Sequence, residues 1–119
     1  MMYRVEIPFK LPSCNDYINA CRRNKYVAAK MKADVERDIG VFISRIPHID
    51  NPVTIAFTWI EESKRRDLDG ICFAKKFILD AMVKQNVLTD DDRNCVTGFT
   101  DTFEYGEEAK VILEIQEVE

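Results

Sequence analysis

The spacing of apolar positions predicts four strands. Residues Tyr3–Phe9 alternate apolar and polar side chains, which is the pattern of a half-buried strand. Both faces of the segment 53–60 lack charge, which is typical of a strand in the interior of a sheet. Two further strands are predicted at about 95–104 and 109–118, joined by a tight turn at Gly106.

Two other segments carry apolar residues at helical spacing. The first runs from about 25 to 44, and Asn24 before it is a candidate N-cap. The second runs from about 70 to 85. Residues 11–24 are rich in turn-forming types and are predicted to be a loop. The order strand–helix–strand–helix–strand–strand predicts an α/β (α+β) fold, a single two-layer sandwich with the helices on one face of a mixed sheet.

Length and composition are those of one small domain. The 119 residues, 46% of them hydrophobic, can bury a core without disulfides. No apolar run approaches the roughly 18 residues that cross a bilayer, and the first residues lack the apolar stretch of a signal peptide. We therefore expect one domain spanning residues 1–119, located in the cytoplasm and without a membrane partner. Four cysteines without a C-x-x-C pair and a single histidine argue against a structural zinc site.

The charge is uneven along the chain. A net charge of −4 argues mildly against a nucleic-acid partner. The charged residues between positions 22 and 32, however, are all cations, and the segment after Thr102 carries six glutamates against the single Lys110. A cationic and an anionic face are thus expected on one domain, which is compatible with binding DNA. A solvated helix surface is the simpler alternative for the cations of the first helix.

The residues that suggest chemistry begin at Lys64, where three basic residues run directly into Asp67 and Asp69. Two carboxylates at this spacing project to the same side of an extended segment, and such oxygens suit Mg²⁺ or Mn²⁺. The acidic turn 90–92 supplies a third ligand if the strand after it lies near the strand that ends at residue 60. A metal with a nearby lysine and arginines would serve phosphodiester hydrolysis.

Helical phase distinguishes the two lysines of the second helix. At about 100° per residue, Lys76 lies near 140° from Ile71 and shares the face opposite the core with Asp69 and Asp80. Lys75 falls at about 40°, at the edge of the apolar stripe, and must snorkel to reach water. Lys76 is therefore the better candidate for a functional lysine.

A simpler interpretation is available for each of these features. Asp is a common N-cap, carboxylates are favoured at helix N-termini, and acidic turns are ordinary on surfaces. Repulsion favours the metal site instead, because the run 90–92 would be costly beside Asp67 and Asp69 without a cation.

Three segments in order, 66–69, 76–84 and 87–91, resemble the RusA-type Holliday junction resolvases, small endodeoxyribonucleases common in phages and prophages. The family pattern is R-D-x-D-N, a helix with a lysine and an F/L-D-A-L segment, then a short turn and D-D. The likeness covers most of the chain, and Pro12 and Ser13 with Asn15 resemble the family's N-terminal region. Two departures are that Gly70 replaces the asparagine and that the helix before Asp80 is three residues longer.

The resemblance implies a homodimer that binds four-way DNA junctions and makes paired symmetric nicks with Mg²⁺ or Mn²⁺, without an organic cofactor. It implies that the catalytic residues are Asp67, Asp69, Lys76 and Asp91, and that the metal ligands are Asp67, Asp69, Asp91 and Asp90. The DNA would be held by Lys64, Arg65, Arg66, Arg22, Arg23, Lys25 and Asn15.

Two alternatives stay open. The same fold could bind junctions without cutting them, keeping the basic residues and tolerating Gly70. An α/β protein with a regulatory Mg²⁺ or Ca²⁺ site is the other, although the acidic turn lacks the ligand spacing of an EF-hand.

Overall fold

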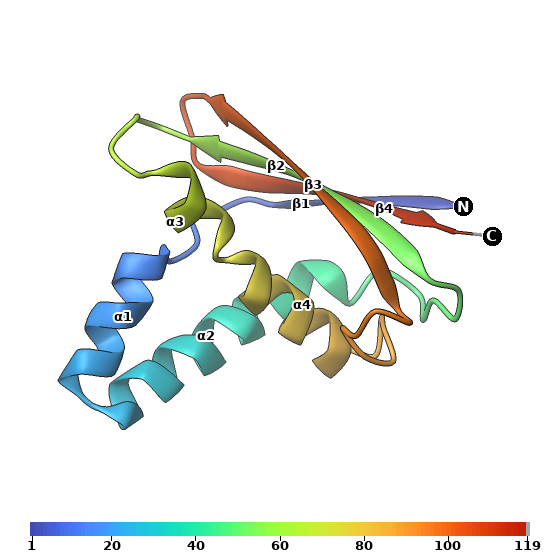
Figure 1. Ribbon diagram of the computed structural model, residues 1–119, viewed down its shortest axis with the longest axis horizontal. Helices are drawn as coiled ribbons and strands as arrows, with labels where there is room; N and C mark the ends of the chain where they lie inside the picture. The colour runs from blue at the N-terminus through green and yellow to red at the C-terminus, as the bar shows by residue number, and fades with distance from the viewer. Residues whose placement is uncertain (119) are drawn as a thin grey trace.

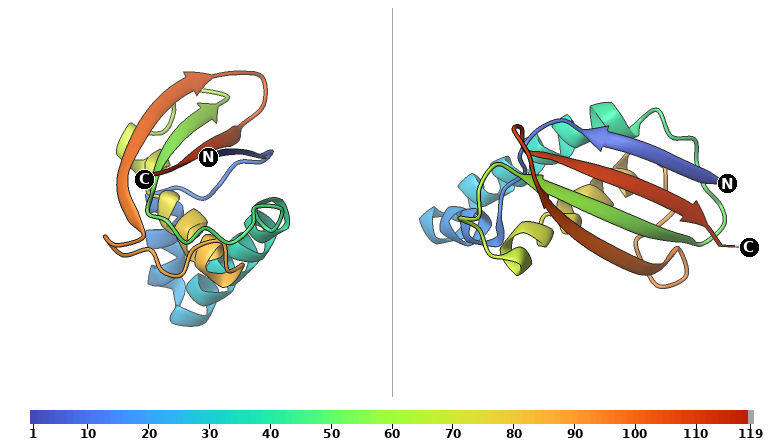
Figure 2. Two further views of the ribbon diagram at one scale, coloured as in Figure 1. Left: turned by 90° about the vertical axis from the view of Figure 1, so that its right-hand side faces the viewer. Right: turned by 90° about the horizontal axis from the view of Figure 1, so that it is seen from above.

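The structure, a computed structural model, describes residues 1–118 (Figure 1). Its elements in chain order are β1 (Met2–Ile7), α1 (Cys14–Arg23), α2 (Lys25–Ile43), β2 (Val53–Glu61), α3 (Leu68–Cys72), α4 (Lys75–Lys84), β3 (Val96–Tyr105) and β4 (Lys110–Glu117). The sheet forms one layer and the helices lie against one of its faces (Figures 1 and 2). The predicted two-layer sandwich is confirmed.

The sheet is mixed, with the strand order β1-β4-β2-β3. Strand β2 is parallel to β3 and antiparallel to β4, and β1 is antiparallel to β4. The last two strands therefore lie on opposite sides of β2. The turn between them crosses the end of β2, where the amide of Gly106 donates to the carbonyl of Glu61 over 3.0 Å.

The core lies between the inner face of the sheet and helices α2 and α4. Alternate residues of β2 from Val53 to Trp59 are at most 2% exposed, as their alternation predicts. Ile39 and Ile43 of α2 and Ile78 and Met82 of α4 are completely buried. Each such side chain stabilises the fold by roughly 1.5–3 kcal/mol, so the predicted stripes are what fixes the helices on the sheet.

The prediction of a loop at residues 11–24 is wrong, because α1 forms there. Ser13 and Asp16 make a capping box, in which the amide of Asp16 donates to Ser13 Oγ (3.2 Å) and the amide of Ser13 donates to Asp16 Oδ2 (2.8 Å). The turn-forming residues thus start a helix rather than a loop. The predicted cap of α2 is confirmed, since Asn24 Oδ1 accepts from the amides of Tyr26 and Val27.

The prediction of one helix over 70–85 is also wrong. The segment divides into α3 and α4 at Phe73 and Ala74, where the amides of Ala74, Lys76 and Phe77 bond to carbonyls three residues back. These tighter turns change the helical phase, so the phase of α4 does not extend back to Asp69. None of the helices within residues 1–118 has the length and apolarity needed to cross a membrane.

Candidate functional site

Asp67 and Asp69 lie where the chain leaves β2 and enters α3. Asp67 holds the N-cap position of α3 without a side-chain capping bond, and Asp69 Oδ1 accepts from the amide of Gly70 over 2.9 Å. Both residues are exposed. A Cβ at Gly70 would have no heavy atom within 4 Å, so the space for the family's asparagine is open.

Arg66 ties this segment to the start of α1. Its guanidinium donates to the carbonyl of Leu11 (2.9 Å) and to Asp16 Oδ2 (2.7 Å), and it lies 3.8 Å from Glu61. The side chain is only 22% exposed. Arg66 therefore holds the Asp67 segment in place, and its predicted contact with DNA would compete with these bonds.

The acidic turn before β3 lies at the opposite end of the sheet. Because β2 and β3 are parallel, the start of β3 is beside the start of β2, and the amide of Val53 donates to the carbonyl of Cys95 over 2.9 Å. In Figure 1 the chain leaves β2 near α3 at upper left and enters β3 at lower right. The expected adjacency of the two strands is present, but their direction separates Asp91 from Asp67 and Asp69.

The consequence for metal binding is direct. Within residues 1–118, no three His, Cys, Asp or Glu side chains gather closely enough to hold a metal ion. One copy of the chain therefore presents two separate acidic groups, Asp67 with Asp69 at one end and Asp90 with Asp91 at the other.

Lys76 belongs with the second acidic group. Its Nζ lies 3.7 Å from Asp80 Oδ2, and the side chain is 63% exposed. Lys76 and Asp80 line a pocket of about 420 Å³ together with Asp90 and Asp91. The prediction that Lys76 and Asp80 share a face is confirmed, whereas their expected alignment with Asp69 rested on a continuous helix.

Lys75 points elsewhere, toward β3. Its Nζ is 2.8 Å from Asp101 Oδ2 and lies over the rings of Phe99 and Phe57, 4.5 and 5.2 Å from their centroids. Trp59 Nε1 donates to the other oxygen of Asp101 over 2.8 Å. Lys75 is thus held by one acid and two aromatic rings and is 17% exposed, whereas its position at the edge of the apolar stripe predicted that it extends into water.

Asp101 is the member of this network that sequence reasoning missed. The available signal was an acid between Phe99 and Phe103, on the inward face of a strand. Cys72 lies beside the same groups. Burial raises the pKa of its thiol, and the nearby carboxylate of Asp101 raises it further.

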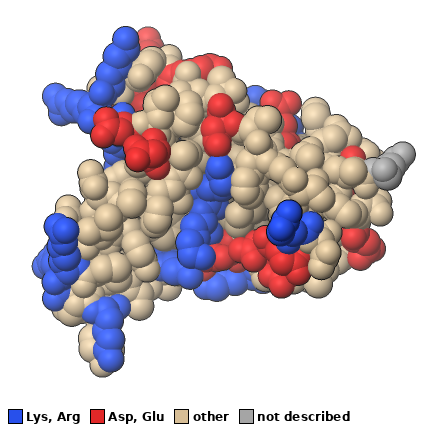
Figure 3. Space-filling view, viewed as in Figure 1, with Lys and Arg blue, Asp and Glu red and all other residues tan. Residues whose placement is uncertain are grey.

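The predicted DNA-binding cations form two exposed clusters. Arg22 and Arg23 end α1 and Lys25 begins α2, at the tip of the helical hairpin, while Lys64 and Arg65 lie in the loop between β2 and α3. Figure 3 shows basic side chains over both places. Asn15, in the first turn of α1, is also exposed. In Figure 1 the loop cluster lies beside α3, which carries Asp69, and the hairpin tip lies at the far end of α1.

Comparison with family models finds no match to this chain, and comparison with curated proteins finds no relative.

Proposed function

We propose that the protein is a metal-dependent, structure-selective DNA endonuclease that resolves four-way junctions by paired symmetric nicks. One observation carries the proposal. Within residues 1–118, the aspartates in no ion pair are Asp67, Asp69, Asp90, Asp91 and Asp92, while each of the others has a Lys, Arg or His partner. The unpaired set contains every predicted metal ligand, and exposed unneutralised carboxylates are the oxygen donors that Mg²⁺ or Mn²⁺ takes.

The separation of these ligands in one chain supports a homodimer. Strand β3 is a ten-residue edge strand that borders only β2, and Phe99 and Tyr105 on it are 45% and 52% exposed. A long edge of this kind is a template for pairing with another strand. The other edge, β1, has only six residues and carries exposed Arg4 and Glu6.

Antiparallel pairing of β3 with β3 of a second copy would complete the site. Two-fold symmetry requires antiparallel pairing, which brings the start of one β3 beside the end of the other. Asp90 and Asp91 of the second copy then lie on the side of Asp67 and Asp69 of the first. Lys76 accompanies Asp91, because both line the same pocket. Each of the two sites would combine Asp67 and Asp69 of one copy with Asp91 and Lys76 of the other.

Each group has a role in hydrolysis. The aspartates would hold Mg²⁺, which supplies activation of water and polarisation of the phosphodiester. The ammonium of Lys76 would offset negative charge that develops on the phosphoryl oxygens. Lys64, Arg65 and the Arg22–Lys25 tip would bind the backbones of neighbouring arms through their exposed charges.

The test uses a mobile four-way junction and a linear duplex, each with Mg²⁺ or with EDTA. We expect Mg²⁺-dependent paired nicks in the junction and none in the duplex. Junction binding in EDTA without cutting in Mg²⁺ would favour the alternative, a binding protein that does not cleave. Absence of both binding and cutting would contradict the proposal.

A further inference from the structure

Glu36 is a buried carboxylate that the proposed reaction does not use. It lies on the face of α2 toward α4 and is 3% exposed. Within residues 1–118 neither of its oxygens accepts a geometrically sound hydrogen bond. They are instead held by charge, with Lys84 Nζ 2.5 Å from Oε1 and Lys32 Nζ 3.7 Å from Oε2. A buried ion pair is weak evidence for stability, since apolar residues often serve as well.

These pairs are part of a longer chain of charges. Lys32 Nζ also lies 3.1 Å from Asp80 Oδ2, and Lys76 Nζ lies 3.7 Å from the same oxygen. The order Lys84–Glu36–Lys32–Asp80–Lys76 links α2 to α4, and we name it the α2–α4 charge network. The hydrogen bond to Asp80 raises the pKa of Lys32, so its ammonium stays charged between the two acids.

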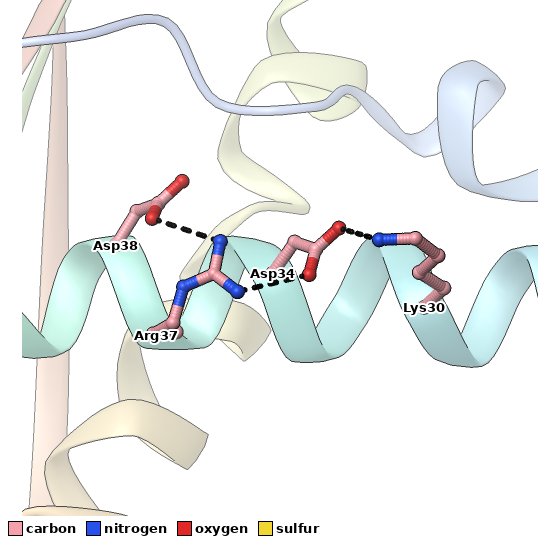
Figure 4. A network of polar contacts seen from close by, with 4 residues as sticks. All are labelled: Lys30, Asp34, Arg37 and Asp38. Carbon is pink, nitrogen blue, oxygen red and sulfur yellow. Dashed lines mark hydrogen bonds and ion pairs between the residues drawn. The ribbon is translucent and has the colours of Figure 1, made fainter.

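The network has a counterpart on the other side of the same helix. Lys30, Asp34, Arg37 and Asp38 also form consecutive ion pairs (Figure 4), but their side chains are 37–75% exposed. Such surface ion pairs contribute little to the stability of the fold, and within residues 1–118 these four residues connect α2 to no other element. The α2–α4 charge network differs because Glu36 within it is buried and all five of its residues line the pocket that also contains Asp90 and Asp91.

We propose that Glu36 is a positioning residue that sets the ammonium of Lys76 beside Asp91. The inference rests on the proposed function for the role of Lys76. Glu36 shares Lys32 with Asp80, and the remaining capacity of Asp80 holds Lys76. If Lys32 pairs only with Asp80, the ion pair between Lys76 and Asp80 weakens. If Lys32 instead moves toward Glu36, the ion pair between Lys76 and Asp80 strengthens.

This competition predicts opposite effects for two substitutions. Glu36→Gln keeps the side-chain shape but removes the charge, so Lys32 pairs with Asp80 and Lys76 is displaced. Lys84→Gln leaves Glu36 with Lys32 alone, so Asp80 is left to Lys76. Lys84 is 62% exposed, but its ammonium is the nearest partner of the buried Glu36 carboxylate, so circular dichroism and urea melts must show that both variants are folded before their lysines are compared. Asp34→Asn is the matched control on the exposed side of α2.

The readout is the acetylation rate of each lysine in the folded protein, measured by mass spectrometry with an amine-reactive ester. We expect Lys76 to react severalfold faster in Glu36→Gln, severalfold slower in Lys84→Gln and unchanged in Asp34→Asn. Unchanged or same-direction shifts in the first two variants would overturn the proposal. In junction cleavage, Glu36→Gln should lower kcat about tenfold with KM unchanged, because the ammonium is misplaced only at the reacting phosphate.

The two measurements separate the two proposals. Opposite acetylation shifts in a protein that never cuts junctions would support Glu36 as the residue that positions Lys76 and reject the nuclease function. Normal cutting by Glu36→Gln, with Lys76 unchanged in reactivity, would reject the positioning role alone.

Discussion

The proposed division of the site between two copies can be tested by mixing two inactive variants. Asp69→Asn removes a ligand at the end of β2, and Asp91→Asn removes one before β3. Each variant alone has the same lesion in both sites of its dimer. In a mixed dimer, one site contains both substitutions and the other has a complete set of proposed ligands.

The structure gives the size of the separation on which this test depends. The nine residues of β2 span about 26 Å at a rise of roughly 3.3 Å per residue, and the two acidic groups lie beyond opposite ends of this strand. Oxygen ligands lie about 2.0–2.6 Å from Mg²⁺ or Ca²⁺, so the ligands of one ion must be within a few ångströms of each other. No side-chain rearrangement in a single copy closes such a gap.

The assay measures nicking of a labelled four-way junction in Mg²⁺. Each variant alone should lose at least about 100-fold, more than the loss of an outer-shell partner usually costs. When equal amounts of the two variants exchange subunits, about half of the dimers contain one copy of each variant. Each mixed dimer has one intact site of two, so nicking should recover to about a quarter of the wild-type rate. The recovered cuts should be single nicks, because only one site of each mixed dimer is complete. An inactive mixture, with dimer exchange shown by differently tagged chains, would refute the shared site.

Four further outcomes follow from the contacts of single residues. Lys76→Ala should lower cleavage about 100-fold and change the free energy of unfolding in urea by less than about 0.5 kcal/mol, because the side chain is exposed. Lys75→Ala should instead destabilise the protein by about 2 kcal/mol, since it removes the ammonium from Asp101 and from two rings; equal stability of both variants would contradict this assignment. Gly70→Asn should be neutral or stabilising by a few tenths of a kcal/mol in the same melts, because its Cβ has open space and asparagine has the better helix propensity. Cys72 should react with iodoacetamide at pH 8 more slowly than a cysteine in a short peptide, because its raised pKa leaves less thiolate, and equal rates would contradict the burial of its thiol.

Most of the strands and helices could be predicted from the sequence, because a buried face requires apolar residues at a regular local spacing. The alternation from Val53 to Trp59 and the cap at Asn24 are local signals, and the structure has both. Helix α1 was missed because Ser13 and Asp16 suit a turn as well as a capping box, and only the packing of the following residues, such as Ala20, decides between them.

Other features depend on contacts that are distant in sequence. The division of α3 from α4 leaves no mark such as proline at Phe73 and Ala74. The direction in which β3 pairs with β2 is likewise absent from either strand's own pattern, yet it decides where Asp91 lies. The network of Lys75 with Asp101 requires the same pairing, because it joins a helix to a strand 26 residues later.

The unpaired aspartates would give the proposed dimer and the proposed metal site a common energetic basis. A single copy keeps Asp67 and Asp69 away from Asp90 and Asp91, so these charges repel little. Antiparallel pairing through β3 would bring the two groups together, and that contact is unfavourable unless a divalent cation neutralises it. Metal binding and dimerisation must then strengthen each other by the same factor, which for coupled sites is typically about 5–150-fold.

We therefore expect Mg²⁺ to lower the dimer dissociation constant in sedimentation velocity experiments by a factor in this range, relative to EDTA with matched ionic strength. Asp69→Asn with Asp91→Asn in one chain is the control. This double variant should dimerise better than the wild type in EDTA, because the repulsion is reduced, and should respond little to Mg²⁺. A wild-type dissociation constant that is the same in Mg²⁺ and EDTA would show that the acids do not meet at the interface, whatever the activity on DNA.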